Sequence, residues 1–229
     1  MYLGIDFGTT NSSIALFDDQ LFPVMLDSSN DNPKVLPSLI YIDRGHNALL
    51  GSKAAEEYLE RETGRPVKWE RRHVGEVEVL AASPGGGLIH YWQDAHTLID
   101  TAANGRLLQS IKTGLRDPDY NGTMIFDRFY PMDELISIIL EYLKIRAESQ
   151  FGRECYGVVL GRPVRFSDQI EVTQRAEEIL FKAARLAGFN DIRFQLEPIG
   201  ALHLHHRSSI DRHIALVFDF GGGTLDLTI

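Results

Sequence analysis

The sequence opens with MYLGIDFGTTNS, Met1 to Ser12, and this stretch decides the fold. Its apolar run from Tyr2 to Ile5 is short and bounded by turn-forming residues, which indicates a buried strand. A second apolar run, Ile14 to Phe17, follows after a short link. We therefore expect these two strands to form a hairpin whose turn contains Asp6 to Thr10.

The expected turn carries the residue types of an anion site. Asp6 stands where the first strand ends, Gly8 allows a tight backbone turn, and Thr9 and Thr10 supply hydroxyl and N–H donors. Such a turn can direct several N–H groups at one anion, which suits a phosphate. An acidic residue among these donors is consistent with a divalent cation between the carboxylate and the phosphates.

The same pattern returns near the other end of the sequence. The apolar run from Ala215 to Phe218 leads into DFGGGT, Asp219 to Thr224, and Asp226 follows. A single glycine-rich turn is a weak signal. Two strand-ending Asp-Phe-Gly turns, each closed by a threonine, predict two sides of one phosphate-binding site.

These motifs resemble the nucleotide-binding domain of the DnaK-type, seventy-kilodalton heat-shock chaperones in the actin-like ATPase superfamily. GIDFGTTNS is similar to the first phosphate motif of that family, and VFDFGGGTLDL is similar to the second. The segments LGRP, AARLAGF and FQLEP are most similar to those of the divergent YegD-like branch. Three further segments show the likeness: VVLGRPVRF with its proline hinge, FQLEPIGAL with its Glu-Pro step, and SIKTGLRD, which resembles the segment carrying the catalytic lysine.

The resemblance implies an α/β fold: the ribonuclease-H-like mixed sheet of five strands with flanking helices, plus a smaller outer subdomain. Residues 1–38 and 132–211 would form the core subdomain of the first ATPase lobe, and 39–131 the outer subdomain. Residues 212–229 would begin a second lobe that closes over the adenosine. We therefore expect the chain to be the N-terminal lobe of a longer protein, inactive as an ATPase by itself.

The resemblance also implies a set of roles. Asp6 and Asp219 would hold Mg²⁺ through its waters, and Lys112 and Glu197 would arrange charge and water around the γ-phosphate of ATP. The expected function is chaperone-like ATP hydrolysis to ADP, coupled to a conformational switch, with unfolded polypeptide or a co-chaperone as partner. The expected phosphate-binding residues are Gly8, Thr9, Thr10, Asn11, Gly221, Gly222, Gly223 and Thr224.

Two of these residues also have simpler interpretations. Most lysines are solvated surface residues, so Lys112 is either such a residue or a point charge at the terminal phosphate. On either interpretation we expect its removal to change stability little. Glu197 before Pro198 is also an ordinary helix start. The arginine that partners the hinge proline in the family has no unambiguous counterpart after Pro163, because the following helix differs in length.

Composition limits the class of protein. The 23 basic and 32 acidic residues argue against a general binder of nucleic acid or anionic membranes. The single cysteine, Cys155, excludes an intrachain disulfide and fits a small buried side chain in a reducing compartment. We see no hydrophobic leader and no apolar run near about 20 residues, so we expect a cytoplasmic protein.

Periodicity predicts the remaining elements. A strand, a helix and a second strand between Tyr156 and Leu196 imply a parallel pair with a crossover. The expected strands are Phe22–Leu26, Leu39–Ile42, Tyr156–Leu160 and Ile192–Leu196, and the expected helices are Gly51–Glu60, Pro131–Gln150 and Gln169–Ala187.

Residues 64–104 match the family least and receive no role. Glu76 to Leu80 alternates as a strand does, Ser83 to Gly87 is a turn, and Leu88 to Trp92 would return as the partner strand. The triple glycine lacks the Gly-Lys-Ser/Thr ending of a phosphate loop, so we interpret it as a hairpin tip. His203 and His206 share a helix face, but no acidic or cysteine ligand has a suitable spacing, which favours an exposed face over a metal site.

Two rival functions stay open. A small-molecule kinase of the same superfamily would share the paired turns but needs an acceptor-binding base, and no aspartate is placed for that role. A non-hydrolysing binding module would need only the nucleotide contacts. A protein kinase is excluded because the Asp-Phe-Gly motifs have no His-Arg-Asp catalytic loop beside them.

Overall fold

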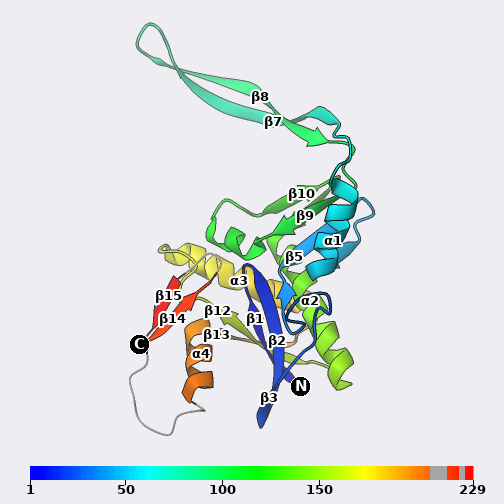
Figure 1. Ribbon diagram of the computed structural model, residues 1–229. Helices are drawn as coiled ribbons and strands as arrows, with labels where there is room; N and C mark the ends of the chain where they lie inside the picture. The colour runs from blue at the N-terminus through cyan, green and yellow to red at the C-terminus, as the bar shows by residue number, and fades with distance from the viewer. Residues whose placement is uncertain (207–215, 222–224, 229) are drawn as a thin grey trace.

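The computed structural model describes residues 1–206, 216–221 and 225–228. Its centre is a mixed six-stranded sheet in the order β13-β12-β1-β2-β3, with β4 paired to β2 (Figure 1). β1 runs parallel to β12, and β12 runs parallel to β13. β1–β2 and β2–β3 are antiparallel, which confirms the expected hairpin. The strands are β1 (Tyr2–Phe7), β2 (Asn11–Asp18), β3 (Gln20–Pro23), β4 (Leu36–Pro37), β12 (Gly157–Arg162) and β13 (Asp191–Leu196).

Helices α2 (Met132–Phe151) and α3 (Ile170–Leu186) pack together and share a hydrophobic core with this sheet. Leu3, Ile5 and Phe7 point into that core, as the two-residue period of a strand requires. The intervening residues of β1, Asp6 among them, therefore face the other side. Gly152 ends α2 with a φ of 63°, in the left-handed region that favours glycine.

A second group of elements follows β4. A three-stranded sheet has the order β6-β5-β9, and α1 packs against it. A short hairpin and the 3-10 helix η1 then lead back to α2. The bounds are β5 (Leu39–Asp43), β6 (Ala48–Leu50), α1 (Gly51–Glu62), β9 (Gly105–Gln109), η1 (Ile111–Arg116), β10 (Gly122–Ile125) and β11 (Arg128–Pro131).

Between α1 and β9 the chain forms a long two-stranded ribbon, β7 (Trp69–Ala82) and β8 (Leu88–Asp100), which extends away from the other elements (Figure 1). This confirms the predicted hairpin and its glycine-rich tip. The strands are much longer than the alternation from Glu76 to Leu80 indicated.

The expected third strand, Phe22–Leu26, is present but shifted, because β3 spans Gln20–Pro23 and the second half of the expected range lies outside it. The ladder ends at Pro23, and Val24 and Leu26 are buried outside it at 0 and 1% exposure. Their backbone N–H groups donate to the carbonyls of Ile14 (3.1 Å) and Pro33 (2.7 Å). The apolar run therefore indicated that these residues are buried. Burial alone does not distinguish a strand from a loop that faces the core. The sheet also has one strand more than expected, because Leu36 and Pro37 pair with β2.

Helix α4 (Glu197–His206) follows β13 directly, and β14 (Val217–Phe220) pairs with β15 (Leu225–Thr228) in an antiparallel hairpin. Both contact α4. Among the described helices, none is long and apolar enough to span a membrane.

Candidate functional site

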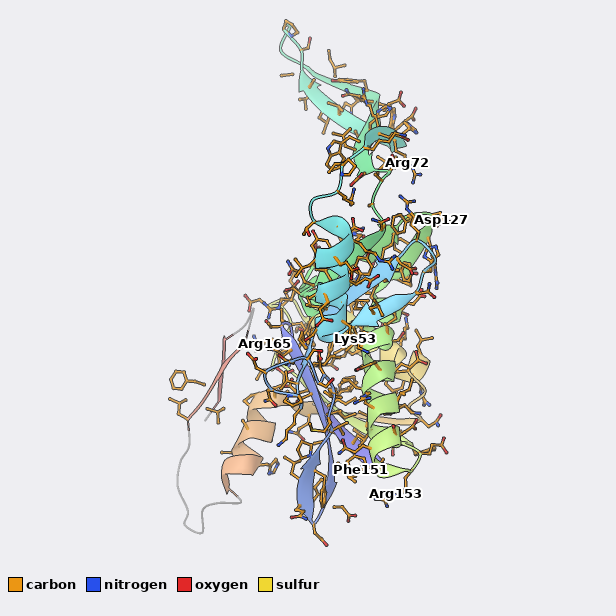
Figure 2. The ribbon with its side chains drawn as sticks, turned by 45° about the vertical axis from the view of Figure 1, so that its right-hand side comes forward. Lys53, Arg72, Asp127, Phe151, Arg153 and Arg165 are labelled. Carbon is orange, nitrogen blue, oxygen red and sulfur yellow. The ribbon has the colours of Figure 1, made fainter. Side chains whose placement is uncertain are left out.

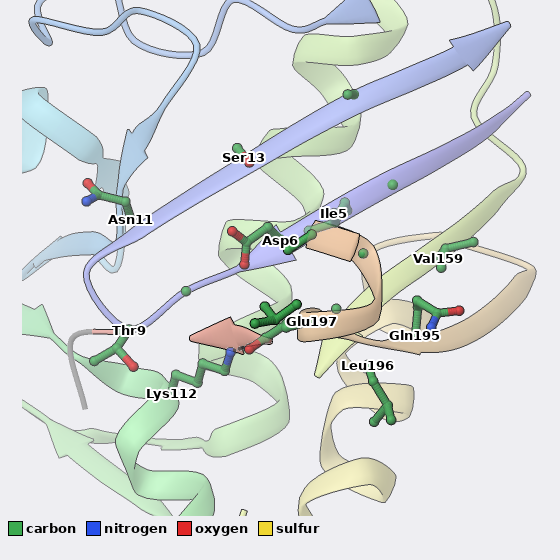
Figure 3. A pocket seen from close by; sticks show the side chains of 18 of the residues that line it. Ile5, Asp6, Thr9, Asn11, Ser13, Lys112, Val159, Gln195, Leu196 and Glu197 are labelled. Carbon is green, nitrogen blue, oxygen red and sulfur yellow. Dashed lines mark hydrogen bonds and ion pairs between the residues drawn. The ribbon is translucent and has the colours of Figure 1, made fainter. Parts of the chain in front are cut away.

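A cleft of about 810 Å³ lies against the face of β1 opposite the core (Figure 3). It is lined by the β1–β2 turn, by η1, by the ends of β12 and β13, and by α4 and β14. Eight of the residues that the sequence predicted for the site line this cleft: Asp6, Gly8, Thr9, Thr10, Asn11, Lys112, Glu197 and Gly221.

The β1–β2 turn is tight enough to demand a glycine. A Cβ atom on Gly8 would lie 2.1 Å from the carbonyl oxygen of Asn11, far inside van der Waals contact. Asp6 stands opposite Ser13 in the ladder just before this turn. The geometry thus places one carboxylate and the backbone of the turn at the same edge of the cleft (Figure 3).

Ser38 holds the β1–β2 turn in place through hydrogen bonds, and the sequence analysis did not predict this role. Its hydroxyl donates to the carbonyl of Gly8 (2.9 Å) and lies 2.9 Å from the hydroxyl of Ser12. Its backbone N–H donates to the carbonyl of Thr10 (2.8 Å). Ser38 is 3% exposed, so water does not replace these bonds. The contact of Ser38 with a turn 30 residues earlier depends on tertiary packing, so local sequence patterns do not predict it.

Lys112 and Glu197 form an ion pair inside the cleft, with 2.7 Å between Nζ and Oε1 (Figure 3). Their side chains are only 13 and 16% exposed. Lys112 belongs to η1, and Glu197 is the first residue of α4. The surface interpretation of Lys112 is therefore wrong. Its burial also argues against the expectation that its removal changes stability little, because a mostly buried partner would lose its counter-charge.

Gly161 lets the Glu197 side chain lie against the backbone of the main sheet. A Cβ atom at this position would come within 3.2 Å of Glu197 Cγ and 3.4 Å of the carbonyl oxygen of Ile5. The strand therefore has a glycine where the Glu197 side chain approaches it closely.

Helix α3 anchors the segment that follows η1. Arg175 donates to the carbonyl oxygens of Asp117 (3.1 Å) and Tyr120 (2.7 Å). It also donates to Asn121 Oδ1 (2.9 Å). The element carrying Lys112 is thus attached to a core helix. No arginine was assigned to this part of the sequence beforehand, because the contact depends on the tertiary packing of α3.

Part of the second predicted turn lies outside the described residues. Gly221 lines the cleft together with Val217 and Phe218. Asp219 lies in β14, opposite Asp226, and its side chain is not among those described. Gly222, Gly223 and Thr224 fall outside the described residues.

The donor set suits a hard cation held through water. Across residues 1–206, 216–221 and 225–228, no three His, Cys, Asp or Glu side chains are grouped to hold a metal directly. His203 is exposed on α4, and the side chain of His206 is not described. Mg²⁺ prefers oxygen ligands and keeps several waters, so the Asp6 carboxylate together with phosphate oxygens would meet its needs.

Comparison with known proteins relates this site to a family. A family model described as Hsp70 protein matches residues 113–229, half of the chain. Three relatives, each named chaperone protein HscA homolog, align over 99% of the chain. Those from Methylobacillus flagellatus, Chromobacterium violaceum and Rickettsia felis are 29%, 30% and 26% identical. The chain spans 31, 32 and 30% of their lengths, about a third in each case.

Proposed function

The chain belongs to the Hsp70 family, and from this premise we propose that its cleft binds the phosphate chain of Mg-ATP in a chaperone ATPase. The observation that carries the proposal is the Lys112–Glu197 pair, which lies in the same cleft as the tight turn after Asp6. A mostly buried lysine ammonium, a carboxylate and a turn with backbone and hydroxyl donors are the groups that phosphoryl transfer needs.

Each group has a distinct part in this proposal. Backbone and hydroxyl groups of Gly8, Thr9, Thr10 and Asn11 bind phosphate oxygens, together with Gly221 and the three residues after it. Asp6 and Asp219 hold Mg²⁺ through its waters, and the cation neutralises charge on the phosphates.

Lys112 and Glu197 act at the terminal phosphate. The ammonium of Lys112 stabilises negative charge that develops there, and Glu197 orients the lysine and accepts a hydrogen bond from the attacking water. Their low exposure strengthens both interactions, because the effective dielectric constant is lower than in bulk water.

The wider proposal follows the family. The chain would form a ribonuclease-H-like, actin-like lobe with core residues 1–38 and 132–211, an outer subdomain at 39–131, and the start of a second lobe at 212–229. ATP hydrolysis in the whole, cytoplasmic protein would drive a conformational switch that serves unfolded polypeptide or a co-chaperone. The three relatives are named as chaperone proteins.

Steady-state ATP hydrolysis by the full-length protein tests the function. We expect turnover that needs no sugar or other small acceptor and that falls about a hundredfold in Lys112→Met, the scale of one lost electrostatic group. Lys53→Met, an exposed lysine on α1 in Figure 2, is the matched control and should hydrolyse as wild type does. Turnover only with an added acceptor would indicate a kinase, and binding without turnover would indicate a non-hydrolysing module.

A further inference from the structure

Arg175 on α3 holds the segment that follows η1, although it is not among the described residues that line the cleft. Its Nη1 donates to the carbonyl oxygen of Asp117 (3.1 Å). Its Nη2 donates to the carbonyl oxygen of Tyr120 (2.7 Å) and to Asn121 Oδ1 (2.9 Å). One planar guanidinium thus joins three acceptors of this segment to a core helix. A lysine ammonium is a point charge and does not offer such a fork of donors.

Tyr120 carries this attachment on to η1. A Cβ atom on Gly114 would lie 2.7 Å from Cδ1 and 2.9 Å from Cε1 of Tyr120, so the aromatic ring packs directly against the backbone of η1. Ile111, the residue before Lys112, is buried in the hydrophobic core. The backbone that carries Lys112 is therefore attached to the core before it and, through Tyr120, to Arg175 after it.

The chain enters η1 from the outer sheet through a strained residue. Gln109 of β9 still pairs with Leu39 of β5, and Ser110 follows with a φ of 54°, in the left-handed region that favours glycine. The carbonyl oxygen of Ser110 accepts hydrogen bonds from the backbone N–H (2.9 Å) and the hydroxyl (2.7 Å) of Thr113. The first turn of η1 is thus tied to the end of the outer sheet, whereas Arg175 ties the other end to the core.

We propose that Arg175 is a positioning residue for Lys112. By holding the residues after η1, it keeps the Lys112 ammonium where it meets Glu197, 2.7 Å away, and the terminal phosphate (Figure 3). This inference rests on the proposed function, in which Lys112 acts at that phosphate. A displacement of the ammonium by about 1 Å should harm the transition state more than ground-state binding, because the reaction depends on alignment.

Arg146 on α2 is a matched control. It too holds a loop to a core helix through a backbone carbonyl, since its Nε and Nη2 donate to the carbonyl oxygen of Met25 at 3.2 and 3.0 Å. Neither Arg146 nor Met25 is among the described residues that line the cleft. A purely structural role of Arg175 predicts that the loss of either arginine has similar effects. A positioning role predicts that only the loss of Arg175 alters the interactions of Lys112.

ATP hydrolysis by the full-length protein tests the consequence for the reaction. We expect Arg175→Gln to lower kcat about tenfold and to change KM by less than about threefold, and Arg146→Gln to change neither. In a Lys112→Met protein, Arg175→Gln should lower turnover no further, because it acts only through that lysine. A wild-type kcat in Arg175→Gln, or a further loss in the Lys112→Met protein, would contradict the proposal.

A second measurement needs no nucleotide, so it decides the role of Arg175 even where a wild type without turnover overturns the proposed function. The double-mutant cycle of Lys112→Met and Glu197→Gln, followed by urea unfolding, gives the energetic coupling of this pair. We expect Arg175→Gln to lower the coupling by at least about half and Arg146→Gln to leave it unchanged. Arg175→Lys replaces Arg175→Gln if circular dichroism shows that the glutamine variant is unfolded, and it should also lower the coupling. Equal coupling with and without Arg175, or an equal loss in the Arg146→Gln chain, would overturn the proposal.

Discussion

At the scale of single residues, the side chains of Lys112 and Glu197 are mostly shielded from solvent and contact each other. Each side chain is less than one-fifth exposed, so each helps to compensate the charge of the other in a place with little water. The proposed nucleotide site should therefore contribute to the stability of the fold as well as to its chemistry. The energetic coupling between the two side chains can therefore be measured by unfolding experiments without any ligand.

We expect Lys112→Met to destabilise the chain by about 2–3 kcal/mol, because it removes the cation that lies 2.7 Å from a mostly buried carboxylate. Glu197→Gln in the same chain should recover part of this loss, since it removes the carboxylate charge that Lys112 had compensated. Urea unfolding of the two single variants and the double variant measures the coupling. Strictly additive effects would show that the two side chains do not depend on one another.

Ser38 gives a second prediction at this scale. Ser38→Ala removes the hydroxyl that donates to the carbonyl of Gly8, whereas Ser12→Ala removes only the partner of that hydroxyl. We expect Ser38→Ala to weaken Mg-ATP binding several-fold, because it loosens the turn, at a cost of about 1–3 kcal/mol in stability. Ser12→Ala should change binding less.

Nucleotide titrations of both serine variants check this order, with their thermal unfolding as the control for stability. Binding that weakens equally in the two variants would mean that Ser38 acts through the core rather than through the turn.

At the scale of elements, sequence and structure agree for several segments that each carry a local signal. The β1–β2 hairpin, helices α2 and α3, and the parallel pair β12–β13 each follow from periodicity and flanking glycine or proline. The contacts that shape the cleft were not predictable in this way. Ser38 meets its turn across 30 residues, and Lys112 meets Glu197 across 85. Such pairings depend on packing, which local patterns do not encode.

The end of α1 shows a further contact of this kind. The Glu62 side chain is 4% exposed and accepts hydrogen bonds from the N–H groups of Asn104 (2.9 Å) and Gly105 (2.8 Å), and from Arg65. Arg65 also pairs with Asp100 at the end of β8. Burial by itself would raise the pKa of Glu62, but these hydrogen bonds outweigh it and lower the pKa. Glu62 thus joins α1 to both ends of the segment that carries the ribbon.

Because the pKa of Glu62 is lowered in the folded chain, the contribution of Glu62 to stability should depend on pH. Since the pKa of Glu62 is lower in the folded chain than the value of 4.5 for a free side chain, the carboxylate stabilises the fold above about pH 4.5. The stabilisation is lost as the pH falls through the lower, folded-state pKa. We expect Glu62→Gln to cost about 2 kcal/mol at neutral pH and progressively less in acid. Urea unfolding from neutral pH to about pH 3 measures this, and a constant difference over that range would contradict it.

At the scale of the whole molecule, the cleft is lined by residues from three separate parts of the chain. The β1–β2 turn comes from the main sheet, Lys112 from η1 beyond the second group of elements, and Glu197 from the helix after β13. A phosphate chain bound there would contact all three at once. This arrangement is the physical reason to expect that nucleotide state alters how the parts of the protein are held together.

The central claim is that this cleft recognises phosphate, and calorimetric titration of the 229-residue chain tests it most directly. We expect Mg-ATP to bind with a Kd in the high micromolar range or weaker, on the order of −5 kcal/mol, because in our proposal the adenosine contacts belong to a second lobe. Magnesium tripolyphosphate should bind within a few-fold of Mg-ATP, adenosine should show no binding, and Lys112→Met should lose most of the affinity. A sub-micromolar Kd for Mg-ATP, or adenosine binding as well as ATP does, would contradict the account.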